Sequence, residues 1–167
     1  MAFTKQPVLS SNPKMLFDQN AFDPPLANYT HDIQSGHTPY VIFDAGNELS
    51  GNEGGMIHRI TVTACGDATT NTTVNEKLVF LYIKAAGQAV GYRWNLYKTA
   101  VLYGATVSNS VPNPEIVWEF KGGLLVSKGS NPDYTQLGIR ASTNYDQTIC
   151  YGDYLSCVVE YTDNALM

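Results

Sequence analysis

The chain has 167 residues, of which 44% are hydrophobic and only 15% are charged, and this length favours a single domain with a buried core. Ten Lys and Arg against fifteen Asp and Glu give a formal net charge of −5, so the basic footprint of a nucleic-acid binder is missing. Lys84 and Arg93 interrupt the longest apolar candidates, none of which reaches the roughly 18 residues of a membrane-spanning helix, so a membrane is not expected as a partner.

The first 38 residues differ from the rest of the chain. Pro7, Pro13, Pro24 and Pro25 punctuate them, and their apolar residues follow neither a strand period nor a helix period. A disordered tail is poor in large apolar groups, whereas the stretch MLFDQNAF has four of them in eight residues. We therefore predict an extended N-terminal arm over residues 1–38 that packs on its own domain or on a neighbouring subunit. Its predicted contact residues are Phe3, Leu16, Phe17, Phe22, Leu26 and Tyr29.

The start of the chain also bears on its location. It has no basic head followed by an apolar stretch and a small-residue cleavage site, which is the pattern of a signal peptide. We therefore expect the chain to be made in the cytoplasm without a signal peptide.

From Tyr40 onward, short alternating runs are separated by clusters of Gly, Asn, Asp, Ser and Pro, which is typical of a β-sandwich or barrel. The runs are TPYVIFDAG, GMIHRITVTACG, NEKLVFLYIKAAG, VGYRWNLYKTAVLYG, PEIVWEFKGGLLVSKG, TQLGIRAST and YGDYLSCVVEYTD. The fifth run is expected to supply two strands around Gly122-Gly123, where glycine permits a turn or a bulge. We predict an all-β fold for residues 39–167: a single jelly-roll-like sandwich of about eight antiparallel strands.

Alternation within the runs predicts which side chains are buried. Ile60, Val62 and Ala64 form the cleaner apolar face of their run. Residues 77–84 (KLVFLYIK) are apolar on both faces, which predicts a central strand. Their β-branched and aromatic residues favour a strand over a helix, and helix signals are nearly absent elsewhere.

A search for catalytic chemistry finds no nucleophile with a neighbouring base and no phosphate-binding loop. Glu115 and Glu119 share a strand face but would lie about 13 Å apart at about 3.3 Å per residue, wider than glycoside hydrolysis uses. His31, Asp32 and His37 have the chemistry of metal ligands, but their spacing matches no familiar motif. We therefore predict that the chain is not an enzyme, and no cofactor is expected.

His58 and the three cysteines do not indicate a catalytic site or a disulfide framework. His58 is expected to be an exposed strand residue. Cys65, Cys150 and Cys157 form no CxxC pair, so they do not predict a disulfide framework. Cys150 and Cys157 flank a Gly-Asp turn and could approach each other, but a buried free thiol is the more ordinary interpretation.

Tyrosine and tryptophan are the remaining candidates for binding. They combine a large rigid surface with a polar edge, which suits sugar-stacking platforms and protein interfaces. In a sandwich, however, most of them are expected in the core and on sheet faces. The candidates are Tyr92, Trp94, Tyr97, Tyr103, Trp118, Tyr134, Tyr145, Tyr151 and Tyr154.

The stretch from Arg59 to Asp163 resembles the small all-β decoration, cement or accessory proteins in the virions of tailed bacteriophages. The likeness lies in the order of its features. HRITVTACG and KLVFLYIKAAGQ are followed by the Trp-containing run YRWNLYKTAVLYG, a Pro-rich loop, a GGLLV corner, the strand IRAST and a terminal YGDYLSCVVEY hairpin.

The resemblance implies a structural protein without catalytic residues that binds the outer capsid surface and stabilises contacts between capsomers. It also implies a homotrimer whose other partner is the major capsid protein or another virion protein, with the N-terminal arm reaching along the shell. The negative net charge fits a position away from packaged DNA.

Two other hypotheses remain. The first is a tail or head-fibre accessory module that binds carbohydrate through exposed Tyr and Trp, in which case these residues should cluster in loops at one end. The second is a polysaccharide depolymerase, which would require two carboxylates facing each other across a pocket.

Overall fold

The computed structural model of the chain describes residues 14–18, 32–33, 39–49, 54–65, 73–74, 76–85, 94–106, 110–128, 134–141 and 154–163. For residues 14–18 and 32–33, and for Cys65, Thr73 and Tyr154, it describes the backbone. None of the helical structure in these residues has the length and apolar character needed to cross a bilayer.

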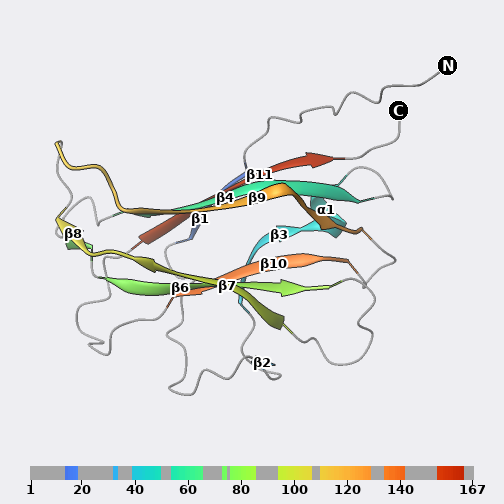
Figure 1. Cartoon of the computed structure of the whole chain (residues 1–167), viewed down its shortest axis with the longest axis horizontal. Helices are drawn as coiled ribbons and strands as arrows, with labels where there is room; N and C mark the ends of the chain where they lie inside the picture. Colours follow the sequence, from blue (N-terminus) through green and yellow to red (C-terminus); the bar gives the residue numbers. More distant parts are fainter. Residues whose placement is uncertain are drawn as a thin grey trace.

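Most of the described residues are β-strand. The elements are β1 (Lys14–Asp18), β2 (Asp32–Ile33), β3 (Tyr40–Asp44), α1 (Ala45–Glu48), β4 (Gly55–Cys65), β5 (Thr73–Val74), β6 (Lys77–Lys84), β7 (Trp94–Leu102), β8 (Ala105–Thr106), β9 (Glu115–Val126), β10 (Gln136–Ala141) and β11 (Tyr154–Asp163). The strands form a four-stranded sheet in the order β1-β11-β4-β9, a five-stranded sheet in the order β2-β7-β6-β10-β3, and a small two-stranded sheet of β5 and β8. All of these pairings are antiparallel, and the two larger sheets stack as layers (Figure 1).

The strand order is that of a jelly roll. The eight strands concerned are β1, β3, β4, β6, β7, β9, β10 and β11. Counted along the chain, the first, eighth, third and sixth lie side by side in one sheet, and the fifth, fourth, seventh and second lie side by side in the other. Two interlocked Greek keys produce this arrangement. The all-β, jelly-roll-like sandwich predicted from the sequence is therefore confirmed.

Two strand assignments from the sequence need correction. The run expected to give two strands is the single strand β9, in which Phe120–Gly123 bulge out opposite His58. The eighth strand is β1, which lies inside the predicted arm and pairs with β11. β2 also belongs to residues 1–38 and pairs with β7. Two segments of the predicted arm therefore run as edge strands of the sheets.

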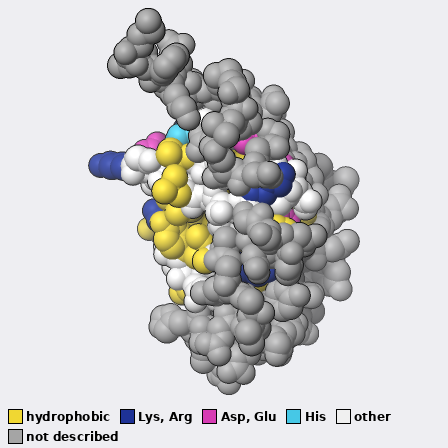
Figure 2. Space-filling view, turned by 90° about the vertical axis from the view of Figure 1, so that its right-hand side faces the viewer, with side chains coloured by type: hydrophobic (Ala, Val, Ile, Leu, Met, Phe, Trp, Pro, Cys, Tyr) yellow, Lys and Arg dark blue, Asp and Glu magenta, His cyan; other side chains and the backbone are white. Residues whose placement is uncertain are grey.

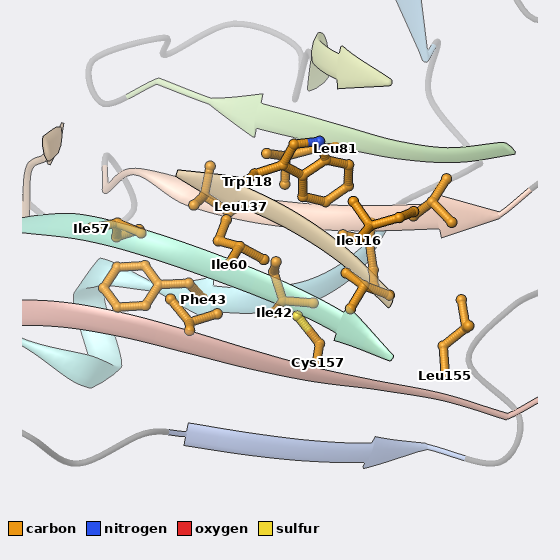
Figure 3. Packing of buried hydrophobic residues seen from close by; sticks show 14 of the residues in the cluster. Ile42, Phe43, Ile57, Ile60, Leu81, Ile116, Trp118, Leu137, Leu155 and Cys157 are labelled. Atoms are coloured by element: carbon orange, nitrogen blue, oxygen red, sulfur yellow. The ribbon is translucent and has the colours of Figure 1, made fainter. Parts of the chain in front are cut away.

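The main core lies between the two sheets. Ile60, Val62 and Ala64 are fully buried there, as predicted. In Figure 3, side chains such as Trp118 from the four-stranded sheet and Leu137 from the five-stranded sheet point into the same interior. β6 lies between β7 and β10, which confirms the predicted central strand.

The short helix α1 continues directly from β3 and was not predicted, because four residues show no periodicity. Its N-cap is Asp44, whose Oδ1 accepts a hydrogen bond of 2.9 Å from the Gly46 N–H. The Asp44 Oδ2 also accepts one of 2.9 Å from the Gln136 side chain on β10. The cap therefore ties the start of the helix to the five-stranded sheet.

Candidate protein-binding surfaces

The structure places the predicted arm contacts only in part. Leu16 and Phe17 lie on β1, opposite Cys157 and Ser156 of β11, and their backbone positions are what is described. The other predicted contacts lie outside the described residues, and they are Phe3, Phe22, Leu26 and Tyr29.

The aromatic candidates divide into three groups. Trp118 is buried in the main core, whereas Trp94 is buried elsewhere, in a second hydrophobic cluster. Tyr97 and Tyr103 are exposed, and Tyr134 is half-buried against the core. The remaining candidates lie outside the described residues or are described as backbone only, and they are Tyr92, Tyr145, Tyr151 and Tyr154.

The described side chains show no arrangement for metal binding or thiol chemistry. Among them, no three His, Cys, Asp or Glu residues form a group that could hold a metal ion. His58 is half-buried rather than exposed, and its Nε2 lies 2.6 Å from the Thr162 hydroxyl. Cys157 is a free thiol in the core, and burial raises its pKa to about 12. The nucleophilic thiolate is therefore scarce at neutral pH.

The other predicted metal ligands and cysteines are not positioned as side chains. His31, His37 and Cys150 lie outside the described residues, and Asp32 and Cys65 are described as backbone only.

The outer side of β4, in the four-stranded sheet, is polar. Thr61 and Thr63 of β4 alternate with buried apolar residues. Beside them, the Arg59 Nε lies 3.0 Å from the Glu160 Oε1 on β11, and both side chains are 44% exposed. An antiparallel sheet that faces water on one side shows this alternation.

The outer face of the five-stranded sheet is apolar. On β6, Val79 and Leu81 point into the main core, so Phe80 and Tyr82 point the other way. There they form the second hydrophobic cluster with Trp94 of β7, and Val41 and Leu96 pack against it. Tyr82 is 2% exposed and Trp94 is 3% exposed, so this face holds a second buried layer.

Gly138 of β10 makes room for that cluster. A Cβ at this position would lie 2.7 Å from the Pro39 Cβ and 3.2 Å from the Trp94 Cζ3. Gly138 is also paired directly with Tyr82.

Burial raises the pKa of the Tyr82 phenol, and the nearby Arg140 guanidinium partly offsets this rise. The phenol therefore stays protonated, as a packed aromatic group with a polar edge.

Toward one end of β6 and β7, the apolar side chains of this outer face become exposed to solvent. Leu78 lies two residues before Phe80 on β6 and directly opposite Val101 of β7. Leu78 is 40% exposed, Val101 is also exposed, and Tyr103, just beyond β7, is 69% exposed. We call Leu78, Val101 and Tyr103 the apolar end patch. Exposed apolar groups that adjoin one another are typical of protein interaction sites.

Other exposed apolar side chains lie on and near β9. Tyr97, the extra residue of a bulge in β7, stacks on Phe120 with ring centroids 6.1 Å apart. The Lys98 Nζ lies 4.7 Å from the centre of the same ring. Val117 and Leu125 are exposed. Figure 2 shows hydrophobic side chains gathered along one flank of the described surface, next to basic ones.

Comparisons of the sequence with protein-family models and with curated proteins find no relative. The functional inference therefore depends on the described surfaces and on the resemblance in the sequence.

Proposed function

We propose that this chain is a structural protein of a tailed-bacteriophage virion, which binds the outer surface of the capsid shell and stabilises contacts between capsomers. The resemblance of residues 59–163 supplies the virion setting. The jelly-roll strand order is compatible with it, since this fold occurs in viral capsid proteins as well as in lectins and cupins. The proposal includes a homotrimer, following the same resemblance.

The observation that carries the proposal is the apolar end patch, where the apolar outer face of the five-stranded sheet reaches solvent. A sheet face that only met water would carry mainly polar side chains, as the outer side of β4 does. Here the face is aromatic, and it continues into the exposed apolar end patch. Covering Leu78, Val101 and Tyr103 with another subunit would remove their apolar surface from water, which is the main favourable term in protein association.

The experiment combines mass measurement with co-sedimentation. Light scattering on the purified full chain should give the mass of a trimer. The chain should also sediment with candidate undecorated phage heads. The double variant Leu78→Lys, Val101→Lys should lose this co-sedimentation, because two charges would have to be buried in the contact. Thr61→Lys, Thr63→Lys is the matched control on the polar outer face, and it should keep head binding.

The proposal would be overturned by a monomer that ignores the heads, or by heads bound equally well by the Leu78 and Val101 variant. If only the Thr61 and Thr63 control lost head binding, the contact would lie on the four-stranded sheet. The apolar end patch would then not be the binding surface.

A carbohydrate-binding accessory module is the second candidate, and the exposed ring of Tyr103 is the observation that favours it. Retention of the chain on a glycan array, lost in Tyr103→Ala, would support this function in place of head binding.

A further inference from the structure

β9 is the last strand in the order β1-β11-β4-β9, and among the described residues it pairs with β4 alone. Its other side therefore has no strand partner there. We call residues Glu115–Glu119 the β9 edge. Pro114 precedes this segment, and the bulge that begins at Phe120 follows it.

The backbone hydrogen-bonding groups of the β9 edge alternate between the side that faces β4 and the open side. The carbonyl of Pro114 accepts a hydrogen bond of 3.0 Å from the Ala64 N–H on β4. Because successive residues of a strand direct their N–H and C=O groups to opposite sides, Ile116 and Trp118 also face β4. The backbone N–H and C=O groups of Glu115, Val117 and Glu119 therefore point away from β4, toward the open side.

The same three residues carry the outward side chains. Ile116 and Trp118 are buried in the main core, whereas Glu115 and Glu119 are exposed and Val117 is 43% exposed. The β9 edge therefore presents the repeat acidic, apolar, acidic on one face, in line with its open hydrogen-bonding groups. An added strand would meet both features together.

The acidic charges of the β9 edge are not neutralised among the described residues. Arg59 lies directly opposite Glu119 in register, but its guanidinium is paired with Glu160 on the other side, with Nη2 to Oε2 at 3.1 Å. Neither Glu115 nor Glu119 has an ion-pair partner in the described part of the chain.

A second copy of this chain is a poor partner for the β9 edge. If two β9 strands paired antiparallel about Val117, Glu115 of one copy would lie opposite Glu119 of the other at both ends of the contact. Like charges directly opposite each other destabilise such pairs, and charged edge strands are a general means of preventing sheet-to-sheet association. The complementary partner is a strand with a basic residue at each of these positions.

We propose that the β9 edge binds an extended segment of another protein as an added antiparallel strand, and that this segment has the pattern basic, any residue, apolar, any residue, basic. Its basic side chains lie opposite Glu115 and Glu119, and its central apolar side chain lies opposite Val117. This binding site is separate from the apolar end patch, and it does not depend on the virion function.

The probe is the capped peptide Thr-Lys-Thr-Val-Thr-Lys-Thr, titrated into the isotope-labelled full chain and followed by amide NMR. We expect saturable shifts of the Glu115, Val117 and Glu119 amide signals, and slower hydrogen exchange at the same three. The peptide with Glu in place of Lys, and the Lys peptide with an N-methylated Val, should both fail to bind. The first reverses the charge match, and the second removes the central N–H donor.

Val117→Pro tests the backbone part of the proposal. It removes an N–H that faces away from β4, a position at which an edge strand tolerates proline. We expect the affinity for the Lys peptide to fall by about fivefold, which corresponds to the loss of one hydrogen bond of about 1 kcal/mol. Val117→Ile keeps the N–H and a branched apolar side chain, and it should bind as well as the unaltered chain. Circular dichroism would confirm that both variants fold.

The double variant Glu115→Lys, Glu119→Lys tests the charge part. It should lose the Lys peptide and gain the Glu peptide, a rescue that general destabilisation would not produce. The proposal is overturned if no peptide shifts the amide signals of the β9 edge at millimolar concentration, if the charge exchange leaves the preference unchanged, or if the unaltered chain pairs with itself through this edge.

Discussion

The two sheets bury similar apolar side chains on their inner faces, but their outer faces differ. On the four-stranded sheet, the outer side of β4 carries Thr61, Thr63 and the ion-paired Arg59. On the five-stranded sheet, the outer side of β6 carries Phe80 and Tyr82, which are buried with Trp94. β4 of the four-stranded sheet thus has the single buried face that is usual in an antiparallel sandwich. β6 of the five-stranded sheet has buried side chains on both of its faces.

The fold alone accounts for the apolar inner faces of both sheets, but it does not account for the apolar outer face of the five-stranded sheet. A jelly roll needs one apolar face per sheet for its core, so the second apolar face of β6 is an additional requirement. The face ends in the apolar end patch, which is why we place the proposed subunit contact there. On the four-stranded sheet, the proposed binding site is instead the β9 edge. There the acidic side chains of Glu115 and Glu119 lie beside backbone N–H and C=O groups that have no strand partner among the described residues.

The largest expected effect concerns the buried outer face. Trp94→Ala should lower the free energy of unfolding by about 3–5 kcal/mol, the range for a buried aromatic side chain. Val158→Ala, at a half-buried position on β11 that faces outward from the polar sheet, should cost clearly less. Urea unfolding followed by fluorescence or circular dichroism measures both. Equal, small losses would show that the outer face of the five-stranded sheet is not packed in solution.

The next effect concerns the bulge in β9, where the polar sheet departs from regular pairing. Gly122 and Gly123 both have a φ of +81°, so alanine at either position costs about 1–2 kcal/mol of backbone strain. A Cβ at Gly122 meets nothing within 4 Å, whereas one at Gly123 collides with the Met56 side chain. Gly123→Ala should therefore lower the free energy of unfolding by about 2–4 kcal/mol.

Thermal and urea unfolding of the two alanine variants, compared side by side, provide the measurement. If Gly122→Ala proved the more costly change, the Met56 contact could not be the cause, and the bulge would have to be held in another way.

The smallest effect concerns the ion pair on the polar outer face. A double-mutant cycle with Arg59→Gln and Glu160→Gln should give a coupling free energy of about 0.2–1 kcal/mol, because both side chains are partly exposed to solvent. High salt should reduce it further. A coupling that is large and indifferent to salt would mean that this face is also shielded from water, which would remove the contrast between the sheets.

Much of the fold was predictable from local patterns. Strict alternation identified the inner face of β4, and the two apolar faces of residues 77–84 correctly indicated a central strand. The Gly122-Gly123 pair indicated a turn or a bulge, and of the two the structure has the bulge, where both glycines take the positive φ that glycine permits.

The errors arose where pairing, not local pattern, decides the structure. Lys14–Asp18 is too short to show a period, and it is a strand because β11 offers it a partner. Residues 115–126 form one strand because β4 continues on both sides of the bulge. The proposed binding site at the β9 edge was not predicted from the sequence either. Glu115 and Glu119 were weighed only as catalytic acids, since a sequence does not show which strand lies at the edge of a sheet.

The position of β11 has a consequence for how the chain folds. β11 lies between β1 and β4, so the four-stranded sheet cannot close until residues 154–163 have left the ribosome. Until then, β4 lacks the strand whose Val159 and Cys157 lie beside Ile60 and Val62, and β1 lacks its only described partner. A topology that depends on pairing distant segments folds slowly, on the scale of milliseconds to seconds. The nascent chain therefore carries incompletely paired apolar strands until residues 154–163 emerge, and chaperones are expected to bind it during that interval.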